Sequence, residues 1–396
     1  MVRGIRLMSL ACLWLVPALL LWMAFSSDWT MVWEKVRVPS WGVSFMDIRS
    51  ITSGVRTVRE GGDPLIANAH DPYHRPLNYP RIWLFLFPAL GITDANVWIV
   101  GLLFCALYLV CISWLMFRCD SGFGVVTLLV AGLSLAPLLS IERGNTDLLI
   151  FAFIFLGCVT ANKYLEPGAF FAAAVLKVFP FAALIADGFR RPNKERTVPI
   201  VLSGLAIAVF AWQWRDLKAI RHATPMSVYL SFGTLSLRAQ TAYMNWKLMA
   251  GTCAAAALIA GIAWFTRPSI EESLWNSKFG KLFSIFGAVY VFAFAIGSNW
   301  DYRLIFLVPT LPLALELTRS ARHRRWGVIY IASVIAAENS FFFGVYQGIP
   351  VGDLSTFVIF AMILPIFLQQ ARNFLLSAGL AFQSSTGLAA SHDKVA

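Results

Sequence analysis

Apolar runs recur along almost the whole chain, and they constrain its fold more than any other feature. Hydrophobic residues make up 58% of the 396 residues and charged residues only 13%, whereas soluble proteins carry about 25% charged residues. Most runs are long enough to cross a hydrocarbon layer of about 30 Å as a helix that rises about 1.5 Å per residue. We therefore expect an all-α polytopic membrane protein in which residues 1–396 form one integral membrane domain.

The runs predict a bundle of about 12 transmembrane helices. Segment 80–94 is short and contains Pro88, and segment 168–189 is interrupted at 177–180, so each is either a full span or a re-entrant pair of half-helices. The first run is expected to stay in the protein, because bulky residues follow it instead of a cleavage site. The apolar segments lie at about 7–25, 80–94, 97–117, 122–140, 147–163, 168–189, 197–214, 248–266, 281–297, 302–318, 326–343 and 354–370.

The net charge of +11 comes largely from short basic clusters beside these segments. Clusters lie at Arg3 and Arg6, at 190–196 and at 319–325, which is the positive-inside arrangement of membrane proteins. They indicate membrane orientation instead of nucleic-acid binding. We expect both termini and a tail at about 371–396 in the cytoplasm, and the long loops 26–79 and 215–247 outside. The side of the 141–147 loop stays open.

The second outer loop is unusually basic for that side of a membrane. It contains Arg215, Lys218, Arg221, Arg238 and Lys247 against a single acid, Asp216. This composition indicates an anionic ligand at the membrane surface, and Arg238 is a candidate to bind it. The alternative is nonspecific contact with anionic lipid headgroups.

The first outer loop contains a predicted amphipathic helix over about 45–60, which ends at Gly61 and Gly62. Ile48, Ile51, Val55 and Val58 share one face, so the helix is expected to lie in the membrane interface. Asp47 lies at the edge of this face and would point toward the membrane side of a site. The alternative is that Ser44 and Asp47 form a capping box at the helix start.

Four further groups place polar residues beside apolar runs, where such residues are costly unless they are paired or functional. The groups are 71–83, 142–147, Lys177 and 299–303. The stiff segment 71–83 contains three prolines. The purely structural alternatives are a Glu142–Arg143–Asp147 network, a snorkelling Lys177 and an Asp301–Arg303 pair. The six cysteines lie in or beside apolar runs and predict neither a disulfide framework nor a metal site. The candidate polar residues are Asp71, His74, Arg75, Asn78, Tyr79, Arg81, Arg143, Asn145, Asp147, Lys177, Asp301, Tyr302 and Arg303.

Taken in order, these motifs resemble the GT-C fold glycosyltransferases that use polyprenyl-phosphate sugars, and in particular bacterial glycosyltransferase family 87. The motifs are "FMDIRSITSGVRTVREGGDPL", "NYPRIW", "RGNTDLLIF", "LKVFP" and "SNWDYR", within residues 44–312. Two positions depart from the family pattern: Arg81 replaces a proline, and Tyr302–Arg303 replaces a histidine.

The resemblance implies a membrane glycosyltransferase with mannosyl- or arabinofuranosyltransferase-like activity, in a bacterial inner membrane with its site facing the periplasm. It implies that Asp47 is the general base and that the transfer inverts the anomeric carbon. A polyprenyl phosphate leaves without protonation, so one carboxylate suffices, whereas a glycosidase needs two. Basic residues would hold the phosphate, with Arg75, Arg81, Lys177, Arg238 and Arg303 as candidates.

The expected partners are the polyprenyl-phosphate sugar donor, a glycolipid or polysaccharide acceptor and membrane lipids, without nucleic acid. No cofactor or metal is required, although a divalent cation between the phosphate and Asp47 stays open. Two other functions also stay open. A transporter or flippase of lipid-linked sugars would have broken helices in symmetric halves and no need for Asp47, and a polysaccharide polymerase or ligase would consume an oligosaccharide-diphosphate lipid.

Overall fold

Helices form almost all of the protein, as the amino-acid composition predicts. The structure, a computed structural model, describes residues 1–224, 230–236, 246–266, 268, 270–297, 299–340 and 351–392. Arg238, predicted to bind an anionic ligand, lies outside the described residues, and of Lys247 only the helical backbone is described. The all-α class is confirmed, apart from one two-stranded ladder.

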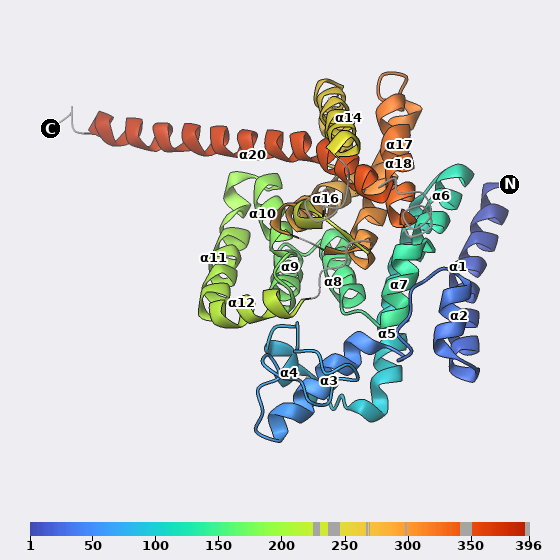
Figure 1. The fold of residues 1–396 in the computed structure, drawn as a ribbon. Coiled ribbons are helices and arrows are strands. Elements are labelled where there is room, and N and C mark those ends of the chain that lie inside the picture. The colour runs from blue at the N-terminus through green and yellow to red at the C-terminus, as the bar shows by residue number, and fades with distance from the viewer. Residues whose placement is uncertain are drawn as a thin grey trace.

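The N-terminal part contains the first predicted spans and the first long loop (Figure 1). The loop is not simply irregular, because it carries two helices, α2 and α3, before the short α4. The elements are α1 (Val2–Ser26), α2 (Trp29–Lys35), α3 (Met46–Arg59), α4 (Ile82–Ala89), η1 (Asp94–Asn96), α5 (Val97–Arg118), α6 (Gly122–Gly132) and α7 (Leu135–Arg143).

The middle part contains several broken helices. The predicted interruption at 177–180 separates α9 from α10, so segment 168–189 is not one continuous helix. The elements are α8 (Asp147–Val159), α9 (Leu165–Leu176), α10 (Phe181–Arg190), η2 (Asn193–Glu195), α11 (Thr197–Trp212), α12 (Trp214–Ala223), β1 (Ser231–Phe232) and α14 (Trp246–Phe265).

The C-terminal part begins with the short helix α15 and ends in the long helix α20. Segment 302–318 starts as a 3-10 helix, η3, and becomes α-helical only at Leu311. One helix, α20, continues through the expected tail to His392 and projects beyond the bundle (Figure 1). The elements are α15 (Glu272–Trp275), α16 (Lys278–Ile296), β2 (Asn299–Trp300), η3 (Asp301–Thr310), α17 (Leu311–Arg319), α18 (Arg324–Glu338) and α20 (Val351–His392).

Four helices of the described chain are long and apolar enough to cross a membrane. Their ranges are Val2–Ser26, Asp94–Arg118, Lys278–Ile296 and Gly352–Ser377. Two bent pairs, α6 with α7 at 45° and α11 with α12 at 72°, raise the number to six if each pair is one span. Hydropathy locates the remaining predicted segments, but the structure divides or shortens them.

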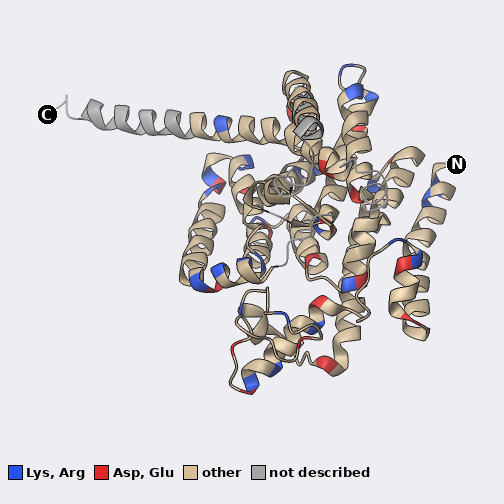
Figure 2. Cartoon of the chain, in the orientation of Figure 1, with Lys and Arg blue, Asp and Glu red and all other residues tan. Residues whose placement is uncertain are grey.

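The three basic clusters lie at one end of the bundle. The start of α1, the α10–α11 connection and the α17–α18 connection are at the end opposite α3 and α12 (Figures 1 and 2). The positive-inside pattern predicts that these three clusters lie on one side of the membrane. The first loop and α12 lie at the other end, beside the end of α7, the start of α8 and the end of α9 (Figure 1).

Candidate functional site

A tight turn between α7 and α8 forms the centre of the site. Gly144 ends α7 in the left-handed conformation, with φ of 55°. A Cβ on Gly144 would lie 2.9 Å from Cβ of Phe45 and 3.0 Å from Cδ1 of Ile48. Glycine is therefore needed twice here, for the backbone conformation and for the close approach of α3.

Asn145, which follows this turn, connects both halves of the site. Its side-chain oxygen accepts the backbone N–H of Asp147 at 2.7 Å and faces Nζ of Lys177 at 3.5 Å. Its amide nitrogen donates to Oδ2 of Asp47. Because the oxygen faces two donors, the amide group must direct its N–H toward the Asp47 carboxylate. Asn145 is fully buried, so this orientation is fixed by its protein partners.

Asp47 lies in the first turn of α3 and is 7% exposed. The helix is preceded by Phe45, a fully buried residue in the left-handed conformation that packs on Phe25 and Trp29. No side chain caps this helix start, so the capping-box alternative is wrong. The hydroxyl of Ser44 instead accepts from the Arg49 guanidinium at 3.3 Å.

The structure contains a helix at the predicted place in the first loop, and most of its predicted apolar face is buried. Ile48 and Ile51 are fully buried and Val55 nearly so, whereas Val58 at the helix end is 44% exposed. This apolar face packs on α4, α5 and α7. The packing holds Asp47 against the α7–α8 turn.

Asp147, at the start of α8, is the second buried carboxylate and is held by two cations. Nζ of Lys177 lies 2.6 Å from Oδ1, and Nε of Arg303 lies 3.3 Å from Oδ2. The Arg303 guanidinium also donates to Oδ1 of Asn299. The structural alternatives of an Asp301–Arg303 pair and of a snorkelling Lys177 are therefore wrong, because both cations bind the buried carboxylate of Asp147.

Lys177 reaches this acid because the chain breaks between α9 and α10. Lys177 has extended dihedral angles and ends α9. The indole N–H of Trp83 donates to the carbonyl of Leu176 at 3.0 Å, which stabilises the break from the side of α4. The Tyr79 ring, 3% exposed, lies 5.1 Å from Nζ of Lys177. Segment 71–83 therefore contributes its last residues to the site.

Arg143 has a different environment from the other cations. Its guanidinium carbon lies 3.8 Å from the ring centre of Trp41 and 4.9 Å from that of Trp300. One terminal nitrogen is 3.9 Å from Oδ1 of Asp47, a long contact. Nε and Nη2 are buried and have no hydrogen-bond partner among the described residues. A buried guanidinium with two unused N–H groups is a ready anion site.

Glu142 faces away from this site. Its Oε1 accepts the indole N–H of Trp29 at 2.8 Å and the hydroxyl of Ser40 at 2.7 Å. The structural alternative of a Glu142–Arg143–Asp147 network is wrong, because each of the three residues contacts a different part of the chain. Glu142 instead fixes the segment that carries Trp41, the ring that covers Arg143.

Most predicted residues of segment 71–83 lie outside the cluster of side chains that surrounds Asp47 and Asp147. Asp71 accepts backbone N–H groups of Tyr73 and Arg75 and the Arg75 guanidinium, so it organises its own loop. Burial alone would raise the pKa of the Asp71 carboxyl, but these bonds lower it below its usual value. His74 is exposed and Asn78 is half-buried.

Arg81 also forms salt bridges with acidic residues outside the cluster. Its guanidinium lies 2.8 Å from Asp63 and 3.0 Å from Asp216, which is in α12. Of the predicted phosphate ligands, Arg75 and Arg81 are therefore already paired at some distance from Asp47.

The corner at 299–303 divides between two environments. Asp301 accepts the hydroxyl of Ser340 at 3.1 Å and lies outside the cluster. The Tyr302 ring, 6% exposed, stacks on Trp300, and its carbonyl accepts the Ser140 hydroxyl at 3.0 Å. The corner is fixed to the second loop by antiparallel pairing of β2 with β1.

The structure therefore brings together a compact set of the predicted residues from five separate segments. Asn299 and Trp300, which belong to the predicted "SNWDYR" motif, and Trp41, which was not predicted, border this set. Trp41 stands only six residues before Asp47, so proximity in sequence could have indicated it. We call the following residues the central cluster: Asp47, Tyr79, Arg143, Asn145, Asp147, Lys177, Tyr302 and Arg303.

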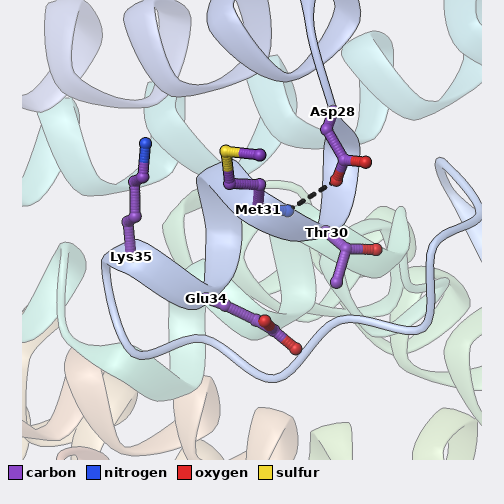
Figure 3. A pocket seen from close by; sticks show the side chains of 5 residues that line it. All are labelled: Asp28, Thr30, Met31, Glu34 and Lys35. Carbon is purple, nitrogen blue, oxygen red and sulfur yellow. Dashed lines mark hydrogen bonds between the residues drawn. The ribbon is translucent and has the colours of Figure 1, made fainter.

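A surface hollow lies over α2, outside the central cluster. It has a volume of about 560 Å³ and is lined by Asp28, Thr30, Met31, Glu34 and Lys35 (Figure 3). In it, Asp28 is occupied in capping α2 through the N–H of Met31, at 2.7 Å. Within the described residues, no three His, Cys, Asp or Glu side chains are grouped as a metal site would need.

Comparisons of the chain with protein-family models, with curated proteins and with solved structures gave no match.

Proposed function

We propose that the protein is a membrane glycosyltransferase that moves one sugar from a polyprenyl-phosphate donor to a glycolipid or polysaccharide acceptor. One observation carries the proposal: the carboxylate of Asp47 lies 3.9 Å from Nη1 of Arg143, whose Nε and Nη2 have no hydrogen-bond partner among the described residues, and both side chains are almost fully buried. A base and an anion-binding group in contact are the two elements that such a transfer requires.

The contacts of the cations support Arg143 as the main phosphate ligand. Arg75 and Arg81 bind acids elsewhere, and Lys177 and Arg303 share Asp147. Arg143, by contrast, has two buried nitrogens, Nε and Nη2, without a hydrogen-bond partner among the described residues, and these can bind a phosphate oxygen. Lys177 and Arg303 add positive charge nearby, which stabilises the charge that develops on the leaving phosphate.

Asp47 is the proposed base. Its carboxylate accepts the proton of the acceptor hydroxyl, whose oxygen then bonds to the anomeric carbon of the sugar. The bond from that carbon to the phosphate oxygen breaks, and the phosphate leaves as an anion. Attack from the face opposite the phosphate inverts the anomeric carbon. Asn145 fixes the Asp47 carboxylate through its amide N–H, and the rings of Trp41 and Trp300 shield Arg143 from water.

The arrangement in the membrane is part of the proposal. We place the twelve apolar segments of the chain in the bilayer, with 80–94 and 168–189 each as either a full span or a re-entrant pair of half-helices. The central cluster then lies at the outer face of a bacterial inner membrane, with α3 in the interface. The supporting observation is that the basic clusters and α3 lie at opposite ends of the bundle (Figure 2).

The decisive experiment is to incubate the purified protein with defined polyprenyl-phosphate sugars and a glycolipid extract. Mass spectrometry should detect an acceptor heavier by one hexose or pentose. Asp47→Asn should lower the transfer rate by about 10²–10⁴-fold, as expected for loss of a general base. Asp63→Asn, which changes another carboxylate of the first loop, is the matched control. Movement of the labelled lipid across vesicles without transfer, unaffected by Asp47→Asn, would support a transporter instead.

A further inference from the structure

Helix α12 is a second feature of the outer end of the molecule, separate from the central cluster. It continues from α11 after a bend of 72°. Among the residues of α11, only Pro199 and Ala206 are buried, and its many exposed side chains are apolar. Such a helix faces lipid, so a helix at a steep angle to its end runs along the membrane surface.

Two tryptophans mark the bend. Trp212 is 83% exposed and Trp214 is 68% exposed, although tryptophan rings are normally covered in folded proteins. Tryptophan is enriched at the boundary between hydrocarbon and headgroups, because the ring is apolar and its N–H requires a polar partner. Both rings therefore indicate that the bend lies at the depth of the headgroups.

The charges of α12 are segregated. Arg215, Lys218, Arg221 and His222 are exposed, and Figure 2 shows the basic positions along this helix. The one acid, Asp216, turns toward the protein and binds Arg81 at 3.0 Å. Ala219 and Ile220 pack against the core. The outward face of α12 is therefore purely basic, which complements a layer of negative charge.

We infer that α12 is an interfacial helix that binds the headgroups of anionic phospholipids. Three exposed cations held on a short rigid helix, beside two tryptophans at headgroup depth, fit a phosphate layer better than a single soluble anion. The site differs from the phosphate site proposed at Arg143, and the inference does not depend on the proposed activity.

The contact between Asp216 and Arg81 extends this interaction to the first loop. Arg81 also binds Asp63 at 2.8 Å, so one guanidinium joins α12 to the loop that follows α3. Arg81 directly precedes α4, whose Trp83 stabilises the chain break at Lys177. Lipid bound to α12 thereby holds a segment that leads into the central cluster.

The test uses the full chain in bilayers of phosphatidylcholine with about 30% phosphatidylglycerol, in which either one lipid or the other is brominated. Bromine quenches nearby tryptophans, and the contribution of Trp212 and Trp214 is obtained from the Trp212→Phe/Trp214→Phe variant. We expect quenching of these two residues by brominated phosphatidylglycerol to exceed its share of the lipid by at least about twofold. The excess should shrink when the salt is raised from about 0.1 M to 1 M.

The variant Arg215→Gln/Lys218→Gln/Arg221→Gln should abolish the excess while leaving quenching by phosphatidylcholine in place. Arg322→Gln/Arg324→Gln/Arg325→Gln removes the same charge from the other end of the molecule and should leave the excess unchanged. Equal quenching by the two lipids in the unmodified protein would overturn the inference, as would an excess that survives the first variant. Absence of quenching by either lipid would show that α12 faces water or a protein partner.

Discussion

Nζ of Lys177 lies 2.6 Å from Oδ1 of Asp147, and both side chains are almost fully buried. The two residues come from different helices, and Arg303 reaches the other oxygen of the same carboxylate from a third element. A buried charge without a partner lowers the stability of the folded protein. The stability therefore depends on Lys177 and Asp147, which also belong to the proposed site.

The first prediction concerns this pair. Asp147→Asn should lower the free energy of unfolding by about 3–5 kcal/mol, because Lys177 and Arg303 remain as buried cations. Thermal unfolding in detergent would measure the loss. Lys177→Met combined with Asp147→Asn should recover part of it. Arg56→Gln, which breaks an exposed pair with Glu60 on α3, is the control and should change stability by less than about 1 kcal/mol.

The second prediction concerns Arg143. Arg143→Lys keeps the charge but removes the planar group that contacts the rings of both Trp41 and Trp300. We expect a rise of about tenfold or more in the KM for the polyprenyl-phosphate sugar, corresponding to loss of about 1.4 kcal/mol of charge-assisted hydrogen bonding. Arg49→Lys, at a half-buried arginine of α3 outside the central cluster, is the matched control. An unchanged KM in the Arg143 variant would remove Arg143 from the phosphate site.

The third prediction concerns pH and the loop held by Asp71. Its pKa is lowered in the folded protein, so the loop is stabilised fully above the usual value of 3.8 and loses that stabilisation as the pH falls below it. The protection of the amide N–H groups of Tyr73, His74, Arg75 and Leu77, measured as hydrogen exchange relative to the intrinsic rate at each pH, should therefore fall as the pH is lowered from about 5 to about 3. Asp71→Asn should make this protection low throughout the range. A loop with the same pH response in both proteins would show that Asp71 does not hold it.

The fourth prediction concerns topology. Cysteines introduced at Glu60 and Lys194, both exposed, should react with an impermeant reagent from opposite sides of the membrane. Arg191 is unsuitable as a labelling site because it is buried and binds Glu166 and Asp187. Labelling of both positions from one side would contradict the proposed orientation.

The sequence predicted the positions of the apolar helices well, including the irregular ones. Pro88 and the interruption at 177–180 are local signals, and the structure has a short α4 and a broken α9–α10 at those places. The bend after α6 also has a local signal, because Gly132 and Pro137 lie on either side of it, whereas no Gly or Pro lies at the bend after α11. Hydropathy reports the composition of a segment and not the direction of its axis, so the 72° turn after Trp212 was missed.

The candidate site was predicted as a list of residues without their pairing. Polar residues beside apolar runs are unusual enough to be noticed singly, as Lys177 and Asp47 were. Their partners depend on which helices pack together, and the partner of Lys177 is 30 positions away while that of Arg303 is 156 away. Trp41 and Trp300 contribute through the contacts of their rings with Arg143. Aromatic residues near a membrane have many other roles, so the sequence does not predict this contact.

The 3-10 helix η3 has a mechanical consequence for the site. It is ten residues long, whereas 3-10 helices rarely exceed three or four residues and longer ones often mark hinges. At a rise of about 2.0 Å per residue it spans about 20 Å, and the same residues as an α-helix would span about 15 Å. Arg303 lies eight residues before Leu311, where α17 begins, so rewinding of η3 would shift Arg303 by about 4 Å along the axis relative to α17. This displacement is about three quarters of one α-helical turn.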